Sequence, residues 1–478
     1  MRLGQTSAVF FASKFLGSII GFVATVVFAR ILGEAVLGQY AAVLALVTWF
    51  TLVGKVGLSE SITKRLSEGD EVGEYLGAGL LSMGTIALLI VVLTLLFQGW
   101  VDRYVGSSVA VVLVVIVLAA LLNAFGSAAL QGRHLVHVTS VLATVAQLVR
   151  SGLQIGLLLA GFGLQAMLAT YALSRFVPGI VSFRFIDTRP KLPSRRHFES
   201  LFDFAKFSWL GNVQSRVFNT LDILLLKAFV ASSFVGVYSA AWSIGLVLDI
   251  FGNAIRTTMF PEMSKVSSAD NDDAAVARLT EDALTFTGLF LIPGFVGGLV
   301  VGDRLLRIYG DGFAIGTEVL TILLFALLVY TYTKQLLNTL NAVDRPDLAF
   351  RTNALFIGSN VVLNVVLISQ YGWVGAAVAT LASGVIGIVL AAGYVNRLLD
   401  VSVPTSEIGR QWVAALAMGA VVYGVRAVTE GHPLTRFNAA YVVCLVGVGA
   451  AVYFGSLLAI SPKFRVTVAD NIPFEVPF

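Results

Sequence analysis

The sequence has few of the residues on which covalent and metal chemistry depend. Its 478 residues include one cysteine, Cys444, and four histidines that lack the spacing of metal ligands. A single cysteine excludes an intramolecular disulfide, and the histidine spacing argues against a metal site. The sequence also contains neither GxxxxGKS nor GxxxxGKT, so we expect no direct ATP hydrolysis. These absences predict a protein that works without a cofactor.

Charged residues are also scarce, at 13% of the chain against about 25% in an average soluble protein. Hydrophobic residues make up 57%, and the mean hydropathy is +0.87. The net charge is +4, but the lysines and arginines lie in short loops between apolar runs rather than in one basic patch. This pattern predicts an all-α polytopic membrane protein and argues against a nucleic-acid partner.

Apolar runs long enough to cross a bilayer, about 20 residues each, recur along the whole chain. We predict about fourteen transmembrane helices, at Ala8–Ala29, Val36–Leu58, Tyr75–Phe97, Ser108–Leu130, Val138–Ala160, Leu164–Ile186, Phe207–Phe229, Phe234–Met259, Leu279–Val301, Phe313–Leu336, Leu348–Gln370, Val374–Val395, Ile408–Val428 and Phe437–Ile460. The first run is too long for a signal peptide and lacks a convincing cleavage site, so we expect it to be a span. Lysine and arginine are more frequent in loops after even-numbered spans, which predicts that both termini are on the cytoplasmic side of the cell membrane.

The sequence contains an internal repeat of six spans. A shift of 198 residues places the Gly-x-Tyr motif at 38–40 on the one at 236–238, and a shift of 210 residues places Gln154 on Asn364. Two halves with the same orientation are related by an axis along the membrane normal. We therefore predict an N-terminal six-helix lobe at 1–187, a basic cytoplasmic connector at 188–206 with an amphipathic segment on the membrane surface, a C-terminal six-helix lobe at 207–396, and two additional helices with a cytoplasmic tail at 397–478.

Three stretches carry a family resemblance: AVFFASKFLGSIIGFVATVVFARILGEAVLGQYAAVLAL near the start, LDILLLKAFVASSFVGVYSAAWSI in the middle, and GWVGAAVATLAS at 372–383. They resemble the polysaccharide transporters (Wzx-type oligosaccharide flippases) of the MATE-like superfamily. The resemblance implies two six-helix lobes in a V around a central cavity. That cavity would open alternately to each side and move a lipid-linked oligosaccharide to the outer leaflet, for glycan assembly at the cell surface. We also expect membrane lipids and other glycan-assembly membrane proteins as partners, and a monomeric state.

The seventh span carries an unusual polar face. Asn212, Arg216, Asn219 and Asp222 recur there at three- and four-residue steps, so they line one side of a helix. A charge at membrane depth is tolerated where it faces protein or water. Arg216 is therefore our first candidate for binding an anionic headgroup, and a structural pair with Asp222 is the alternative.

Other polar residues within the spans are secondary candidates for the cavity. They are Lys14, Lys55, Arg150, Gln154, Arg175, Arg256 and Asn364. Lys14, Lys55 and Arg256 lie near span ends, where a long side chain can instead extend to the membrane interface. Arg150, Gln154 and Asn364 could either contact sugars or bridge helices through hydrogen bonds. Asp222 and Asp249 are the candidate sites of ion coupling.

A flippase needs a wet cavity with cations for phosphate and with amides or hydroxyls for sugar, but it needs no nucleophile. A cation-coupled drug or metabolite antiporter is the first alternative, and it would require acidic residues deep in the spans. A membrane glycosyltransferase or polymerase is the second, and it would require a large aqueous loop with catalytic carboxylates. The longest loops have about twenty residues, so we expect a carrier and not an enzyme. Proton or sodium coupling, membrane potential and passive flow remain alternatives for the driving force.

Overall fold

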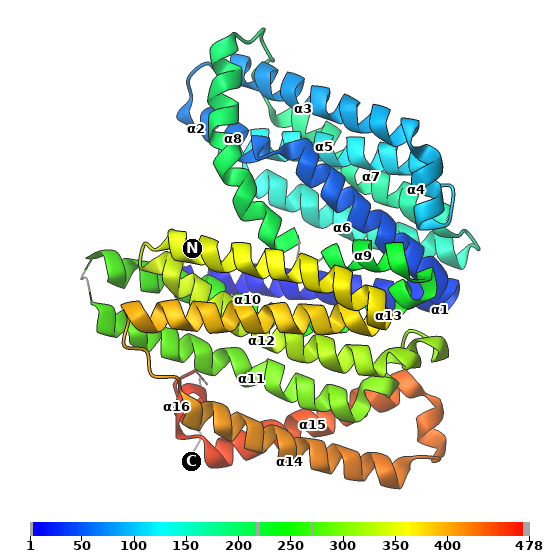
Figure 1. Cartoon of the computed structure of the whole chain (residues 1–478), viewed down its shortest axis with the longest axis vertical. Coiled ribbons are helices and arrows are strands. Elements are labelled where there is room, and N and C mark those ends of the chain that lie inside the picture. Colours follow the sequence, from blue (N-terminus) through cyan, green and yellow to red (C-terminus); the bar gives the residue numbers. More distant parts are fainter. Residues whose placement is uncertain (1–2, 217–219, 270–271, 472–478) are drawn as a thin grey trace. The chain divides into compact units, whose positions relative to one another are not determined.

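The computed structural model describes residues 3–216, 220–269 and 272–471, with side chains described for 20–206, 220–268, 272–433 and 435–469. These residues form helices joined by loops, with no strand among them, so the predicted all-α class is confirmed. The chain divides into two compact units, Met1–Ser239 and Ala240–Phe478, which we call the N-terminal and C-terminal units (Figure 1). The domain boundaries expected at 187, 206 and 396 stay predictions.

The N-terminal unit begins with a long bent helix and continues with shorter ones. Its elements are α1 (Leu3–Lys55), α2 (Leu58–Glu68), α3 (Val72–Leu96), α4 (Gln98–Val105), α5 (Ala110–Gly132), α6 (Val136–Leu159), α7 (Leu164–Ser182), η1 (Phe183–Phe185), α8 (Arg195–Arg216), α9 (Asp222–Phe229) and the start of α10 (Ser232–Ala269). Helix α5 packs against α2, α3 and α7, and α6 packs against α7 and α1.

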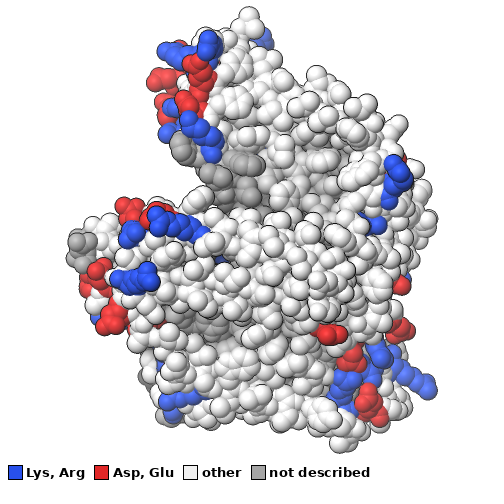
Figure 2. Space-filling model, in the orientation of Figure 1, with Lys and Arg blue, Asp and Glu red and all other residues white. Residues whose placement is uncertain are grey.

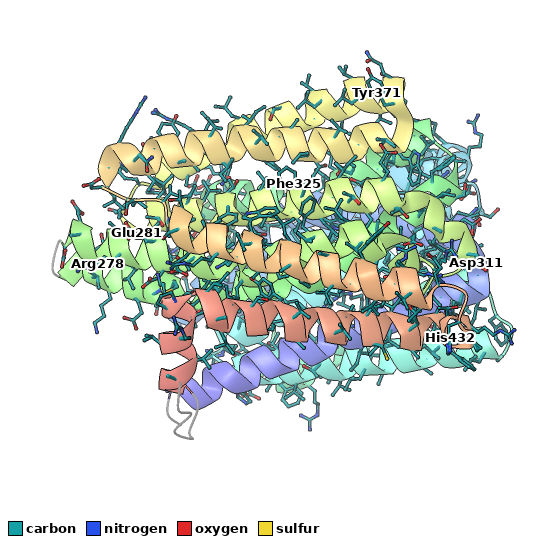
Figure 3. All side chains as sticks on the ribbon, turned by 90° about the horizontal axis from the view of Figure 1, so that it is seen from below. Arg278, Glu281, Asp311, Phe325, Tyr371 and His432 are labelled. Carbon is teal, nitrogen blue, oxygen red and sulfur yellow. The ribbon has the colours of Figure 1, made fainter. Side chains whose placement is uncertain are left out.

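The C-terminal unit contains the remainder of α10 and the elements that follow it. These are α11 (Asp273–Leu306), η3 (Asp311–Gly316), α12 (Thr317–Ala342), α13 (Pro346–Leu398), α14 (Thr405–Thr429), η4 (Pro433–Arg436), α15 (Asn438–Ile460) and α16 (Pro462–Asn471). Figure 3 shows Arg278 and Glu281 at one end of the unit and Asp311 and His432 at the other, with Phe325 between them. The helices therefore run side by side in alternating directions.

Eleven helices in the described part of the chain are long and apolar enough to cross a membrane. Two of them, α1 and α13, each contain a bend at a glycine, Gly33 with φ 78° and Gly372 with φ 60°. Glycine adopts a positive φ without steric cost, so the chain changes direction there without a loop. Each bend lies between two predicted spans, and the total of fourteen stays a prediction.

Charged residues lie mostly at the ends of these helices. In Figure 2, lysine, arginine, aspartate and glutamate side chains gather over the helix ends within each unit, and the flanks of the helices on this face are almost free of charge. The hydrocarbon core of a bilayer requires such an uncharged band. This distribution fits the membrane-spanning assignment.

Helix α8 begins earlier than the sequence analysis predicted. The seventh span was expected at Phe207, but the helix starts at Arg195 and continues to Arg216. After Pro193 no proline or glycine interrupts the sequence until Gly211, and Arg195 pairs with Glu199 one turn on at 2.7 Å. Residues 195–206 of the expected connector therefore belong to the start of α8, and the placement of an amphipathic segment on the membrane surface stays a prediction.

One turn shows the internal repeat directly. His134 follows α5 with φ 61°, and Asp344 follows α12 with φ 55°, although neither is glycine. In both turns the N–H of the next residue donates to the carbonyl five residues before it, at 2.9 Å in each. This hydrogen bond closes a helix end through a left-handed residue. The two turns are 210 residues apart, which is one of the two shifts of the predicted repeat.

The repeated Gly-x-Tyr motifs meet each other within the N-terminal unit. A Cβ on Gly38 of α1 would lie 1.8 Å from the carbonyl oxygen of Ser232, and one on Gly236 of α10 would lie 1.9 Å from that of Glu34. Two helices cross this closely only where neither has a side chain. The glycines of the motif are therefore explained by helix packing.

The tyrosines of the two motifs both form buried hydrogen bonds to a neighbouring helix. The Tyr238 hydroxyl donates to Oδ2 of Asp222 at 2.6 Å, and Nε2 of Gln154 donates to the Tyr40 hydroxyl at 3.2 Å. All four side chains are less than 10% exposed. A buried polar group without a hydrogen-bond partner costs free energy, so each of these hydrogen bonds stabilises a tyrosine hydroxyl that is buried by helix packing. The motif is a packing device repeated in both halves.

The last two predicted spans correspond to α14 and α15 and pack against α11. Arg426 donates to both carboxylate oxygens of Asp303, at 2.7 and 2.9 Å. Towards the other end of α14, Nε2 of Gln411 donates to the carbonyl of Thr285 at 2.8 Å. Contacts near both ends of α14 fix it along the length of α11.

Candidate functional site

A cavity of about 790 Å³ lies within the N-terminal unit. We call it the main cavity, and it is bounded by α1, α2, α5, α7 and α8. Helical spacing explains why so many of its lining residues are polar: Thr48, Thr51 and Lys55 repeat along α1, and Asn123, Ser127 and Gln131 repeat along α5. The residues with hydroxyl or amide groups that line it are Thr48, Thr51, Ser59, Thr63, Ser67, Asn123, Ser127, Gln131 and Tyr171.

The main cavity has an excess of positive charge among its described lining residues. Lys55, Lys64 and Arg175 line it, together with one carboxylate, that of Glu60. The ammonium group of Lys64 lies 4.6 Å from the ring centre of Phe204, a favourable cation–π distance. Cations with amides and hydroxyls between them are suited to an anionic, hydroxyl-rich ligand.

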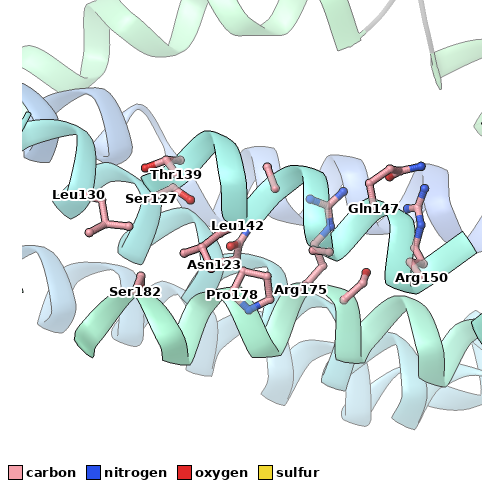
Figure 4. A pocket seen from close by; sticks show the side chains of 13 residues that line it. Asn123, Ser127, Leu130, Thr139, Leu142, Gln147, Arg150, Arg175, Pro178 and Ser182 are labelled. Carbon is pink, nitrogen blue, oxygen red and sulfur yellow. The ribbon is translucent and has the colours of Figure 1, made fainter. Parts of the chain in front are cut away.

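A smaller cavity of about 60 Å³ shares Asn123, Ser127 and Arg175 with the main cavity (Figure 4). Arg150 of α6 lines this smaller cavity as well. The guanidinium carbons of Arg150 and Arg175 lie 5.1 and 5.2 Å from the ring centre of Tyr171. In the described part of the chain, no carboxylate forms an ion pair with either arginine.

Gln154 contacts neighbouring helices and lines neither of these two cavities. Its Nε2 donates to the Tyr40 hydroxyl at 3.2 Å and to the Met167 carbonyl at 2.9 Å, and the residue is 2% exposed. In the second repeat, Asn364 donates to the Asn360 carbonyl at 3.0 Å, and Asn360 donates to the Ser383 hydroxyl at 3.0 Å. The contacts of Gln154 with α1 and α7 favour the helix-bridging alternative for this residue, whereas Asn364 donates to the preceding turn of its own helix, α13.

The other candidates from the sequence differ in what the structure describes of them. The side chains of Lys14, Asn212 and Arg216, and the whole of Asn219, are outside the described residues, so their roles stay predictions. Lys55 lines the main cavity, and Arg150 lines the smaller one beside it. Asp222 is buried and accepts the hydrogen bond from Tyr238.

The C-terminal unit contains a buried ion pair that the sequence analysis did not identify. Nζ of Lys334 on α12 lies 2.7 and 2.9 Å from the carboxylate oxygens of Asp249 on α10. Thr331 and Asn253 also donate to that carboxylate, at 3.0 and 2.7 Å. Arg256, two turns further along α10, is exposed.

The repeat relates this ion pair to the main cavity. A shift of 198 residues places Thr51 on Asp249 and Lys55 on Asn253, and one of 210 residues places Ala124 on Lys334. Thr51, Lys55 and Ala124 all line the main cavity. An ion pair therefore occupies, in the C-terminal unit, the positions that surround open space in the N-terminal unit.

Sequence reasoning missed Lys334, Lys64 and Tyr171 for different reasons. Lys334 lies in an apolar run, and its partner is 85 residues away in the sequence. Lys64 belongs to the short helix α2, which lies between two predicted spans and is too polar to be detected by hydropathy. The spacing of Tyr171 and Arg175, one helical turn apart, is a signal that could have identified their contact.

Known proteins resemble the chain over its whole length. Haloferax volcanii has two such relatives: a probable flippase, AglR, 29% identical over 98% of both chains, and a probable low-salt glycan biosynthesis flippase, Agl15, 29% identical over 100% of both.

Solved structures show the same fold. The lipid II flippase MurJ, in an inward closed conformation, matches with a TM-score of 0.80 at 16% identity, over 96% of this chain and 100% of that one. An inward-facing MATE family multidrug resistance transporter matches with a TM-score of 0.61 at 13% identity, over 80% and 95%. The MATE-like fold implied by the sequence resemblance is thereby confirmed.

The sequence profile of a family described as polysaccharide biosynthesis protein matches residues 3–267, which is more than half of the chain. The chain therefore belongs to this family of polysaccharide biosynthesis proteins.

Proposed function

We propose that this protein is a flippase that moves a lipid-linked oligosaccharide from the cytoplasmic to the outer leaflet by alternating access. The observation that carries the proposal is the main cavity, a polar space with excess positive charge inside a membrane-spanning unit. The names of the two Haloferax relatives, a probable flippase and a probable glycan biosynthesis flippase, support it. The substrate joins a phosphate, a hydroxyl-rich glycan and a hydrocarbon tail.

The cost of placing cations at membrane depth makes Arg150 and Arg175, which both line the smaller cavity, informative. Inserting an arginine or lysine at membrane depth costs about 2.5–3.5 kcal/mol on insertion scales. Arg150 and Arg175 lie in the middle of α6 and α7, and no carboxylate among the described residues pairs with them. An anionic ligand that binds there would offset this cost, and the phosphate of the substrate would be such a ligand.

The proposal includes orientation, state and mechanism. Both termini lie on the cytoplasmic side, the protein acts as a monomer, and transport involves no covalent step. Asp222 and Asp249 stay the candidates for cation coupling; Asp249 is paired with Lys334, and Asp222 accepts a hydrogen bond from Tyr238. An antiporter would need acidic groups facing its cavity, and Glu60 is the one carboxylate among the described lining residues of the main cavity.

The direct test is translocation in reconstituted vesicles. A polyisoprenyl phosphate carrying a fluorescent disaccharide is placed in the bilayer, and a membrane-impermeant quencher reports the fraction that reaches the outside. We expect protein-dependent translocation, with proton and sodium gradients revealing any coupling. Absence of translocation, together with gradient-driven export of a small organic cation, would instead identify an antiporter.

Arg175→Ala is expected to slow translocation about tenfold to a hundredfold. The physical reason is the loss of one charge-assisted contact to phosphate, worth about 1.5–3 kcal/mol. Arg278→Ala is the matched control, because its side chain is 68% exposed and lies outside the cavities described here. Equal rates for the two variants, at equal protein levels, would show that Arg175 does not bind the substrate.

Arg216→Ala is expected to abolish translocation while the protein still inserts, and Arg216→Lys should restore part of it. A cation on the polar face of α8 would contact the headgroup through its charge, which lysine keeps. Rates are compared in the same vesicle assay at matched expression. A well-expressed Arg216→Ala protein with the normal rate would refute this assignment.

A further inference from the structure

An apolar groove lies against the cationic cavities of the N-terminal unit. It encloses about 120 Å³ between α6 and α7, and it is lined chiefly by aliphatic side chains such as Val145, Val149, Leu173 and Val177. These four residues are 46–52% exposed, so the groove opens to the surface along the two helices. In a membrane-spanning unit, an open aliphatic groove accommodates hydrocarbon.

The groove, the smaller cavity and the main cavity are neighbours, because each shares lining residues with the next. Arg150 lines the groove and the smaller cavity, and Arg175 lines the smaller cavity and the main cavity. Polarity therefore changes stepwise, from the hydroxyl- and amide-rich main cavity, through two arginines, to an aliphatic surface. Figure 4 shows Arg150 and Arg175 on neighbouring helices at the smaller cavity.

The two arginines are held but not neutralised. Tyr171, at 9% exposure, provides a ring to both guanidinium groups, and its hydroxyl accepts a hydrogen bond from Arg175 at 3.2 Å. A ring face orients a guanidinium without cancelling its charge. Within the described residues neither arginine has a carboxylate partner, so donors remain for a phosphate.

We infer that the substrate's lipid phosphate binds between Arg150 and Arg175, with the first isoprenoid units in the groove between α6 and α7 and the saccharide in the main cavity. This inference rests on the proposed flippase function and specifies how its substrate lies. The ligand consists of a glycan, a phosphate and a hydrocarbon chain in that order. The main cavity, the two arginines and the aliphatic groove follow one another in the same order along the protein.

The repeat indicates that this seat belongs to the N-terminal unit. A shift of 210 residues places Arg150 on Asn360 and Arg175 on Val385, so neither cation recurs. Asn360 is instead committed to a hydrogen bond with Ser383. Because the second half of the repeat lacks both charges, the two-arginine site for the phosphate is present in the first half and not in the second.

Photo-crosslinking tests the inference. p-Benzoylphenylalanine replaces Val149 in the groove or, as a matched control, Leu88 of α3, which is 63% exposed and aliphatic but lies outside the groove. The proteins are irradiated in vesicles that contain the polyisoprenyl phosphate with its fluorescent disaccharide. We expect at least fivefold more crosslinked lipid at position 149, falling to the control level when Arg150→Ala and Arg175→Ala are added. Excess polyisoprenyl phosphate should compete, and the neutral polyisoprenol should not.

The same proteins are also measured for translocation, which separates the two proposals. If the protein translocates the lipid but crosslinks equally at positions 149 and 88, the proposed lipid-binding site is wrong and the flippase function stands. The same holds if crosslinking at position 149 does not change when the two arginines are replaced. Selective crosslinking without translocation by the unmodified protein would establish the lipid seat as a binding site and overturn the flippase function.

Discussion

Lys334→Ala is expected to destabilise the C-terminal unit by about 3–5 kcal/mol, the cost of leaving one partner of a buried ion pair alone. Asp249 is 8% exposed, and among the described residues its carboxylate would keep the hydrogen bonds from Thr331 and Asn253 alone. Neither neutral donor supplies a compensating charge. Thermal unfolding of the purified protein in detergent, followed by the loss of soluble monomer on heating, measures the effect.

The double variant Lys334→Ala with Asp249→Asn is the matched control. It removes both charges, so it should recover most of the lost stability, since the larger part of the cost comes from the isolated carboxylate. If Lys334→Ala alone unfolds at the temperature of the unmodified protein, the pair does not stabilise this unit.

Gly38→Ala is expected to destabilise the N-terminal unit by about 3 kcal/mol or more, at the upper end of overpacking costs. The added Cβ would lie 1.8 Å from the Ser232 carbonyl oxygen and 2.8 Å from the Gly236 nitrogen. Both are backbone atoms, so no side chain can rotate away, and the two helices must separate. Gly236→Ala should have a similar effect, because its Cβ would meet the Glu34 carbonyl.

Gly84→Ala provides the comparison for this variant. Gly84 is also a helical glycine in a predicted span, but a Cβ there would meet no atom within 4 Å. Alanine has the higher helix propensity, so Gly84→Ala should be neutral or slightly stabilising. Equal stability of Gly38→Ala and Gly84→Ala would mean that the close helix crossing does not contribute to folding.

The features that the sequence predicted well are local or periodic. Spans follow from runs of apolar residues, and the repeat follows from the Gly-x-Tyr motifs, whose glycines and tyrosines the structure explains by packing. The start of α8 was placed too late, because hydropathy detects the apolar part of a helix and not its polar extension.

The site was less predictable, because its residues come from distant parts of the chain. Arg150 and Gln154 are one turn apart on α6, yet Arg150 lines a cavity and Gln154 bridges helices. Sequence periodicity assigns both to one face and cannot separate these roles. The pairing of Lys334 with Asp249 joins α12 to α10, and the residues next to either one in the sequence do not indicate it.

The central claim, that the main cavity binds the anionic substrate during transport, is tested most directly by one variant. Lys64→Ala with Arg175→Ala removes two of the three cations among the described lining residues. The fluorescent lipid-linked disaccharide is followed in vesicles beside the Arg278→Ala control. We predict translocation at least a hundredfold slower than the control, at equal protein and equal thermal stability, because two charge-assisted contacts are lost. A rate equal to that of the control would contradict the claim.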